Sequence, residues 1–260
     1  MRMDTLHVFL AWLLVVAADR AAPHSKAASI RTTGVTNVTR MYADLRHIPV
    51  GSTSVLQLNL AYNYIRKLDN YTFVENRYRD VKKIYLFRNA IVKVGVDAFR
   101  GLHQLETVDL SDNNLTTLAY DTFATNVNLR ELILANNRIR FIRQATFVRS
   151  HSLQTLSLTG NRITEIHDAT FIGLANLRRL MLADNPLTTL APMCFKSLKK
   201  LRYLSLANTD VHRIHVDMFF AFPRIIHVGG TPFADTFRPP LTQLTSQSFA
   251  ELTHFDQTID

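Results

Sequence analysis

The residues with the most chemical potential in this chain are two histidines and one cysteine. His212 and His215 stand three positions apart, a spacing at which two imidazoles sometimes share a metal ion. Cys194 is the only cysteine, so it is a candidate for a reactive thiol or an intermolecular disulfide. No third ligand accompanies the histidines, and we interpret them as surface side chains. We interpret Cys194 as a packing residue, so the sequence predicts no metal site.

Motifs that carry catalysis are missing from the sequence. It contains no GxSxG, no HExxH, no P-loop and no glycine pattern for dinucleotides. Those patterns place a nucleophile, a metal-bound base or a phosphate cradle where a reaction needs one. The sequence therefore predicts a protein that is not an enzyme and that uses no cofactor.

The chain begins with the stretch "MRMDTLHVFLAWLLVVAADR", which favours export. Arg2 gives positive charge, residues 6–18 are mostly apolar, and small residues at 16–18 offer a cleavage site. Such a run is short for a bilayer span, which takes ~20 residues. An N-terminal buried helix is the alternative. We expect a signal peptide at 1–18, a secreted protein without a transmembrane anchor, and a net charge of +9.

Three sequons would carry glycans if the protein is exported. They begin at Asn37, Asn70 and Asn114, each followed two positions later by threonine. Asn114 is expected on a turn and Asn70 on the connection behind the sheet. All three are therefore candidate glycosylation sites.

A repeat of 24 residues organises most of the chain. The unit "LRELILANNRIRFIRQATF" starts at Leu129, and close copies start 24 residues before it and after it. The first copy starts at Val55 and is followed by a spacing two residues longer. Seven units share the pattern LxxLxLxxNxLxxLxxxxF. They divide the chain into a signal peptide (1–18), an N-terminal segment and cap without cysteines (19–54), seven repeats (55–224) and a degenerate eighth repeat (225–260).

Each position of the repeat has a physical reading. The "LxL" segment alternates with period two, so its leucines face inward and the residues between them face outward. Stacked parallel strands would form one continuous sheet. Phenylalanine 19 positions into each unit is expected to form a spine on the opposite side. Asparagine at the turn is expected to bond backbone groups that the strand leaves open, as a ladder of Asn63, Asn89, Asn113, Asn137, Asn161 and Asn185.

This pattern resembles the extracellular leucine-rich repeat superfamily, in its 24-residue type. Toll-like ectodomains, Slit-like proteins and insect secreted leucine-rich immune proteins carry the same unit. The resemblance covers roughly residues 45–260. It implies an α/β solenoid, a horseshoe with a parallel sheet on the concave face and short irregular or helical segments on the convex face. It also implies that a protein ligand binds the concave face.

Both ends depart from the family pattern because cysteines are absent. Leu45–Pro49 resembles the end of an N-terminal cap, and the stretch 228–237, "VGGTPFADTF", resembles the start of a C-terminal cap. In a second interpretation, which we favour, 228–237 leads into an insertion, and Leu241 and Leu244 resume the eighth repeat at its eleventh and fourteenth positions. That interpretation predicts an exposed parallel edge and a possible oligomer through it.

The outward residues of the strands are the candidate binding site. They are not uniform: an aromatic and basic group precedes an acidic repeat, and apolar residues with arginines follow. Aromatic and arginine side chains are frequent anchors of protein interfaces. The alternative is that acidic and basic rows only pair across neighbouring strands. The candidates are Lys83, Tyr85, Phe87, Arg88, Asp109, Ile133, Arg179, Met181 and Tyr203.

Arginines also gather after the asparagine turns of the fourth and fifth repeats. This basic flank consists of Arg138, Arg140, Arg143, Arg149 and Arg162. It suggests an alternative function, an extracellular matrix or adhesion protein that binds an anionic glycan. We expect no nucleic acid partner, since no recognition motif is present. The leading hypothesis is a secreted binding protein for a protein ligand, in innate immune recognition or cell-surface signalling.

Overall fold

The computed structural model describes residues 36–140 and 147–248, within a compact unit that runs from Gly34 to Asp260. The expected signal peptide at 1–18, Arg143 of the basic flank and the chain after Ser248 lie outside the described residues. Among the residues that are described, no helix is long and apolar enough to cross a bilayer.

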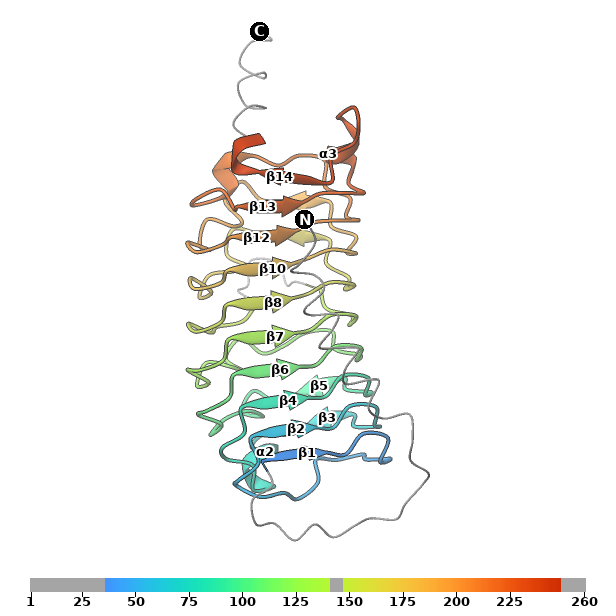
Figure 1. Ribbon diagram of the computed structural model, residues 1–260, viewed down its shortest axis with the longest axis vertical. Coiled ribbons are helices and arrows are strands. Elements are labelled where there is room, and N and C mark those ends of the chain that lie inside the picture. The colour runs from blue at the N-terminus through green and yellow to red at the C-terminus, as the bar shows by residue number, and fades with distance from the viewer. Residues whose placement is uncertain (1–35, 141–146, 249–260) are drawn as a thin grey trace. The chain divides into compact units, whose positions relative to one another are not determined.

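One sheet of ten strands runs through the stack, and every neighbouring pair except the last is parallel (Figure 1). The first nine strands each have three residues, and each is offset from the next by one turn of the chain. In sheet order the strands are β1 (Asn37–Thr39), β2 (Gln57–Asn59), β4 (Lys83–Tyr85), β6 (Thr107–Asp109), β7 (Glu131–Ile133), β8 (Thr155–Ser157), β10 (Arg179–Met181), β12 (Tyr203–Ser205), β13 (Ile225–His227) and β14 (Gln243–Thr245).

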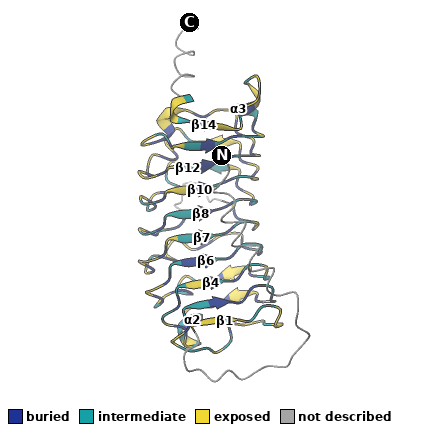
Figure 2. Cartoon of the chain, in the orientation of Figure 1, coloured by how far each residue is buried: buried dark blue, intermediate teal, exposed yellow. Residues whose placement is uncertain are grey.

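The alternating pattern of the repeat explains which side of each strand is buried. Leu132 at the middle of β7 and Leu134 just after it are fully buried, whereas Glu131 and Ile133 are half-buried. Neighbouring repeats bury the equivalent leucines in one continuous core (Figure 2). A single turn cannot bury its own apolar side, so the turns stabilise one another.

The opposite side of the stack holds short elements and the aromatic spine. Phe73, Phe99 and Phe123 stack with ring centroids 5.2 and 4.9 Å apart, and Phe195 continues the same stacking to Phe219 at 5.3 Å. The elements here are a two-stranded sheet of β3 (Lys67–Leu68) and β5 (Lys93–Val94), another of β9 (Glu165–Ile166) and β11 (Thr189–Leu190), the helix α2 (Thr72–Glu75) and the 3-10 helix η1 (Val216–Met218).

The asparagine ladder connects each turn to the one before it. Asn137 is buried, and its amide nitrogen donates to the carbonyl oxygens of Leu134 at 3.1 Å and of Leu110, one repeat earlier, at 2.9 Å. Its Oδ1 accepts the backbone N–H of Leu115 at 3.0 Å. The same arrangement is found at Asn113, Asn161 and Asn185. At Thr209 the column keeps one bond, from the hydroxyl to the Leu206 carbonyl.

The residue just before each ladder position adopts a left-handed backbone conformation. Its φ lies between 51° and 73° in nine successive turns, although only two of the nine residues are glycines. The strands must turn sharply there, and a positive φ directs the chain out of the sheet. We call these residues the left-handed column: Tyr42, Tyr62, Arg88, Asp112, Asn136, Gly160, Asp184, Asn208 and Gly230.

The segment before the first predicted repeat adds a strand to the sheet. β1 pairs in parallel with β2, and Val38 lies opposite Leu58. Asn63 joins this segment to the stack, because its Oδ1 accepts the N–H groups of Ala43 and Leu45, each at 3.0 Å. The N-terminal segment therefore behaves as one more turn.

The C-terminal end differs from the favoured expectation. β13 continues the parallel sheet, but β14 returns antiparallel to it, with Leu244 opposite Ile226. The expectation that Leu241 and Leu244 resume the repeat is therefore wrong. The open parallel edge is expected at the end of the array, near Asp260, whereas in the described residues the last parallel strand, β13, is already covered by β14 of the same chain.

Local chemistry explains this reversal. The hydroxyl of Thr231 accepts the N–H of Ala234 at 3.0 Å and so caps the helix α3 (Pro232–Asp235), in which Pro232 takes the first position. The carbonyl of Thr242 then accepts the N–H groups of Val228 and Gly229 at 3.0 and 3.2 Å. The stretch 228–237 thus redirects the chain, without cysteines, so that β14 covers the last parallel strand.

Candidate functional site

The outward side of the ten-stranded sheet, here called the strand face, carries the nine candidate residues. The parallel register aligns Tyr85 with Asp109 and then Asp109 with Ile133. The same register aligns Ser157 with Met181, and Arg179 with Tyr203. Phe87 and Arg88 follow β4 after one residue, the buried Leu86. The candidates therefore fall into three groups: residues that begin a strand, residues that end a strand, and the two residues after β4.

An aromatic cluster, formed by Tyr42, Tyr62 and Phe87, lies at the β1–β4 end of this face. The rings of Tyr42 and Tyr62 stack at 4.5 Å, and Phe87 meets Tyr62 edge-on at 5.4 Å. The guanidinium of Arg88 lies 5.2 Å above the Tyr62 ring. Tyr42 is 66% exposed, which is high for a ring already in contact with another. The sequence indicated Phe87 and Arg88 but not Tyr42 and Tyr62, whose shared place in the left-handed column is visible only in the structure.

An acidic repeat follows the aromatic cluster. Asp109 is half-buried, and its Oδ1 accepts the backbone N–H and the hydroxyl of Ser111 at 2.9 and 2.6 Å. Burial raises the pKa of Asp109 above its ordinary value, although the bonds from Ser111 oppose that shift. Burial also raises the pKa of Tyr85, and the charges of Glu131 and Asp109 add to the effect. Asp109 and Glu131, on β6 and β7, therefore lie between the aromatic cluster at the β1–β4 end and Arg179 on β10.

Charge pairing across strands explains part of the face. Lys82 lies 3.9 Å from Glu106, and Arg88 lies 3.6 Å from Asp112. Both pairs are partly exposed to solvent, with side-chain exposures of 33% to 50%, so each adds little to stability. Pairing therefore accounts for Lys82 and Arg88, which lie before and after β4, as the alternative interpretation expects.

The other end of the face pairs arginine with aromatic rings. The guanidinium of Arg179 lies 4.9 Å above the ring of Tyr203, which in turn lies 5.2 Å from His227. Burial lowers the pKa of His227 below its ordinary value. Ile133 and Met181 are half-buried between the two ends. The structure thus separates the candidates into an aromatic end and an arginine–tyrosine end.

The basic flank predicted from the sequence is divided. Arg149 is half-buried, pairs with Asp121 at 2.9 Å and lies 5.6 Å above the ring of Tyr120. Arg138, Arg140 and Arg162 are exposed. Of the four described arginines, one is therefore engaged within the fold.

The three sequons differ in exposure. Asn37 is exposed on β1. Asn70 is exposed, and its Oδ1 accepts the backbone N–H of Asp97 at 3.1 Å. Asn114 is half-buried, so it is less accessible than its predicted turn position suggests.

The residues first considered for chemistry are placed apart from this face. Cys194 is fully buried, and burial raises the pKa of its thiol far above the ordinary value, so a thiolate is disfavoured. His215 and His212 are exposed, and His215 contacts Asp217 at 3.3 Å. In the described ranges no group of three or more His, Cys, Asp and Glu side chains is arranged to hold a metal ion.

Comparisons with known proteins agree with this architecture. The leucine rich repeat family model matches residues 79–139, 127–187, 151–211 and 175–227, which together span more than half of the chain. The chain therefore belongs to the leucine-rich repeat family. No curated protein matches it in sequence.

Solved structures with the same fold include TLR13 in its complex with ssRNA13, at 26% identity and a TM-score of 0.61 over 71% of this chain. The leucine-rich repeat domain of APL1B matches 89% of the chain at 16% identity and a TM-score of 0.57. The LRIM1/APL1C complex matches 70% at 18% identity and a TM-score of 0.53. The chain spans 27% of the TLR13 chain, 70% of the APL1B chain and 33% of the matched chain in LRIM1/APL1C.

Proposed function

We propose that this chain is an exported, non-enzymatic binding protein whose strand face holds a protein ligand. The observation that carries the proposal is the aromatic cluster with Arg88, beside Tyr85 in the neighbouring strand row. Tyrosine and arginine dominate the energetically important positions of protein interfaces. Polar side chains accompany the cluster, since Asp112 lies 3.6 Å from Arg88 and Lys83 is exposed at the start of β4.

The backbone under this site supports binding without rearrangement. The ladder residues Asn63 and Asn89 bond both their own turn and the preceding one beneath the cluster. Rings held on a rigid sheet lose little conformational freedom when a ligand binds. The site therefore favours recognition by preorganised contacts.

The role that we propose is immune recognition or cell-surface signalling. It is supported by the likeness to the LRIM1/APL1C complex and to FLRT2 in its octameric complex with Latrophilin 3 and Unc5D. In both complexes a leucine-rich repeat protein is assembled with other proteins. A shared fold does not choose a ligand, so the choice rests on the strand face of this chain.

The test compares three forms of the full chain as bait in native extracellular fluid. The parent is compared with Tyr85→Ala/Phe87→Ala on the strand face and with Met193→Ala/Phe220→Ala, a control that removes exposed apolar side chains elsewhere. Partners are cross-linked and quantified by mass spectrometry. We expect the strand-face variant to lose its specific partners about tenfold or more, as interface anchors do. Equal capture by the strand-face variant and the parent would show that the proposal is wrong.

A further inference from the structure

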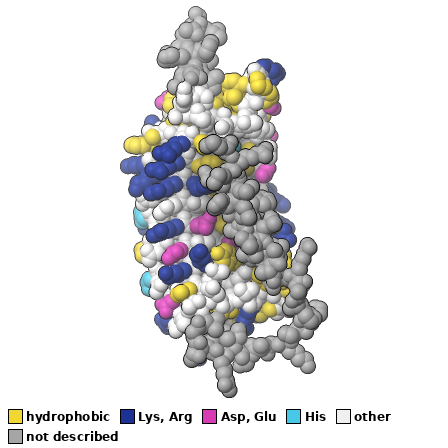
Figure 3. Space-filling model, viewed as in Figure 1, with side chains coloured by type: hydrophobic (Ala, Val, Ile, Leu, Met, Phe, Trp, Pro, Cys, Tyr) yellow, Lys and Arg dark blue, Asp and Glu magenta, His cyan; other side chains and the backbone are white. Residues whose placement is uncertain are grey.

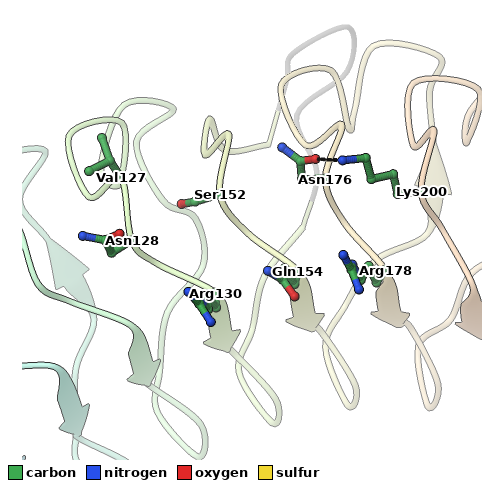
Figure 4. Close-up of a pocket in the computed structure, with 8 residues that line it drawn as sticks. All are labelled: Val127, Asn128, Arg130, Ser152, Gln154, Asn176, Arg178 and Lys200. Carbon is green, nitrogen blue, oxygen red and sulfur yellow. Dashed lines mark hydrogen bonds between the residues drawn. The ribbon is translucent and has the colours of Figure 1, made fainter.

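A second surface lies beside the strand face, where β7, β8 and β10 begin. A hollow of about 280 Å³ is bounded there by eight residues: Val127, Asn128, Arg130, Ser152, Gln154, Asn176, Arg178 and Lys200 (Figure 4). Three of them are cations, four carry amide or hydroxyl groups, and none is a carboxylate or an aromatic ring. Figure 3 shows Lys and Arg side chains gathered along this side of the stack.

Backbone bonds hold the floor of the hollow in line. The N–H of Gln154 donates to the carbonyl of Arg130 at 2.9 Å, and the N–H of Arg178 donates to the carbonyl of Gln154 at 2.8 Å. The backbone N–H of Arg202 donates in the same way to the carbonyl of Arg178 at 2.9 Å. The N–H of Ile225 donates to the carbonyl of Arg202 at 3.2 Å. Arg130, Gln154, Arg178 and Arg202 therefore follow one another at the strand interval of ~4.8 Å, with Gln154 between the first two arginines, and Lys200 comes from the turn just before Arg202. We call Arg130, Arg178, Lys200 and Arg202 the basic row.

The wall of the hollow is built from side chains fixed to the preceding turn. Asn128 donates to the carbonyl of His103 at 2.8 Å, and Asn176 donates to the carbonyl of His151 at 2.6 Å. The ammonium of Lys200 donates to the Oδ1 of Asn176 at 2.6 Å (Figure 4). This wall orients polar groups toward the same space as the arginines.

The charge of the basic row is not neutralised within the fold. In the part of the chain that the structure describes, no carboxylate lies within ion-pair distance of Arg130, Arg178, Lys200 or Arg202. This contrasts with Lys82, which pairs with Glu106 on the same side of the sheet. A line of unpaired cations makes a positive potential that attracts a linear anion.

We propose that the basic row is a binding site for a linear sulfated glycan. Guanidinium groups bind planar pairs of anionic oxygens through two parallel hydrogen bonds, and the ammonium of Lys200 adds a point charge. The amides of Asn128 and Gln154 supply donors and acceptors for sugar hydroxyls. A single-stranded nucleic acid is the competing polyanion, but its bases need aromatic platforms, and the lining of the hollow has none. The site is separate from the protein-binding face proposed above.

The experiment measures the affinity of the full chain for a size-defined heparin oligosaccharide at physiological ionic strength. The site variant is Arg130→Gln/Arg178→Gln/Lys200→Gln. The control variant, Arg66→Gln/Lys93→Gln/Lys196→Gln, removes the same charge from exposed positions outside both the basic row and the basic flank. Two further probes are the same oligosaccharide without its sulfates and an oligouridylate of equal charge. Thermal melting of each variant checks that the fold is retained.

We expect the site variant to bind heparin about tenfold more weakly, because three charge contacts are lost. The control variant should change the affinity less than about twofold, and removal of the sulfates should abolish binding. Equal losses in the two variants would overturn the proposal, because net charge alone would then explain binding. Undiminished binding of the desulfated oligosaccharide would also overturn it. A different outcome is that the oligouridylate binds the parent more tightly than heparin does and binds the site variant more weakly than the parent. That result would overturn the glycan proposal and identify the basic row as a nucleic acid site.

Discussion

Leu115 and Asn137 are 22 positions apart in sequence, and the backbone N–H of Leu115 donates to the Oδ1 of Asn137 at 3.0 Å. The same amide donates to carbonyls in both repeats, so one side chain holds the turn of its own repeat and the turn before it. Each asparagine of the ladder thus links two successive turns by hydrogen bonds. Its contribution to stability is the first quantity to measure.

Replacing Asn137 with alanine should lower the free energy of unfolding by about 3 kcal/mol, because buried backbone groups lose their partners. Asn137→Thr should be less harmful, since Thr209 shows that a hydroxyl keeps the bond to the carbonyl three positions earlier. Urea unfolding of both variants checks this order. A threonine variant as unstable as the alanine variant would contradict it.

The leucines of the strands give a second prediction. Leu134 is fully buried, so Leu134→Ala should lower the free energy of unfolding by about 2–5 kcal/mol through lost burial and a cavity. Arg138→Ala, at an exposed position of the same repeat, should change it by less than about 0.5 kcal/mol. Thermal or urea unfolding provides both values, and similar shifts would show that the assignment of the interior is wrong.

These two features were predictable from the sequence because they repeat. Seven copies fix the positions of Leu134 and Asn137 by comparison within one chain, and a period of two decides which side of a strand is buried. The left-handed column was not predictable in the same way. Six of its nine residues are Gly, Asn or Asp, the types that most readily adopt a positive φ, but Tyr62 and Arg88 share the angle without that chemistry, so residue type marks the position only in part.

Gly160 provides a test of that column. A Cβ added there would clash with the Oδ1 of Asn136, and the positive φ of 66° is strained for alanine. Gly160→Ala should therefore cost about 1–2 kcal/mol or more. In an Asn136→Gly background the steric part of this cost should disappear, leaving only the backbone strain. The double-mutant cycle measures the difference, and purely additive effects would contradict the clash.

Asp109 predicts a pH dependence. Burial raises its pKa in the folded state, so its contribution to stability is full below the unfolded pKa of about 3.9 and is lost as pH rises through the folded pKa. Asp109→Asn should therefore be more stable than the parent at neutral pH, with a difference that shrinks toward acid pH. Urea unfolding between about pH 3 and pH 8 follows this gap. A parent that is the more stable protein at neutral pH would contradict the assignment.

The candidate site was only partly predictable from the sequence for a related reason. Strand alternation placed Tyr85 and Arg179 on the outward side, but the contact of Arg88 with Tyr62 depends on where two turns bring their side chains. At the C-terminus the leucines alone suggested a resumed repeat. The cap at Thr231 and the bonds to Thr242 redirect the chain, and periodicity carries no signal for such contacts.

The antiparallel return of β14 also sets where such a sheet can lengthen. A copied 24-residue unit placed between β7 and β10 would find the same parallel register and the same ladder on both of its sides. A unit added after β13 would have to displace β14 from the bonds that it makes there. Gain or loss of length by duplication is therefore easier among the parallel strands from β1 to β13, a range that includes the basic row, than after β13. The number of cations in that row would change whenever the unit gained or lost carries an arginine at the aligned position, as those of Arg130 and Arg178 do.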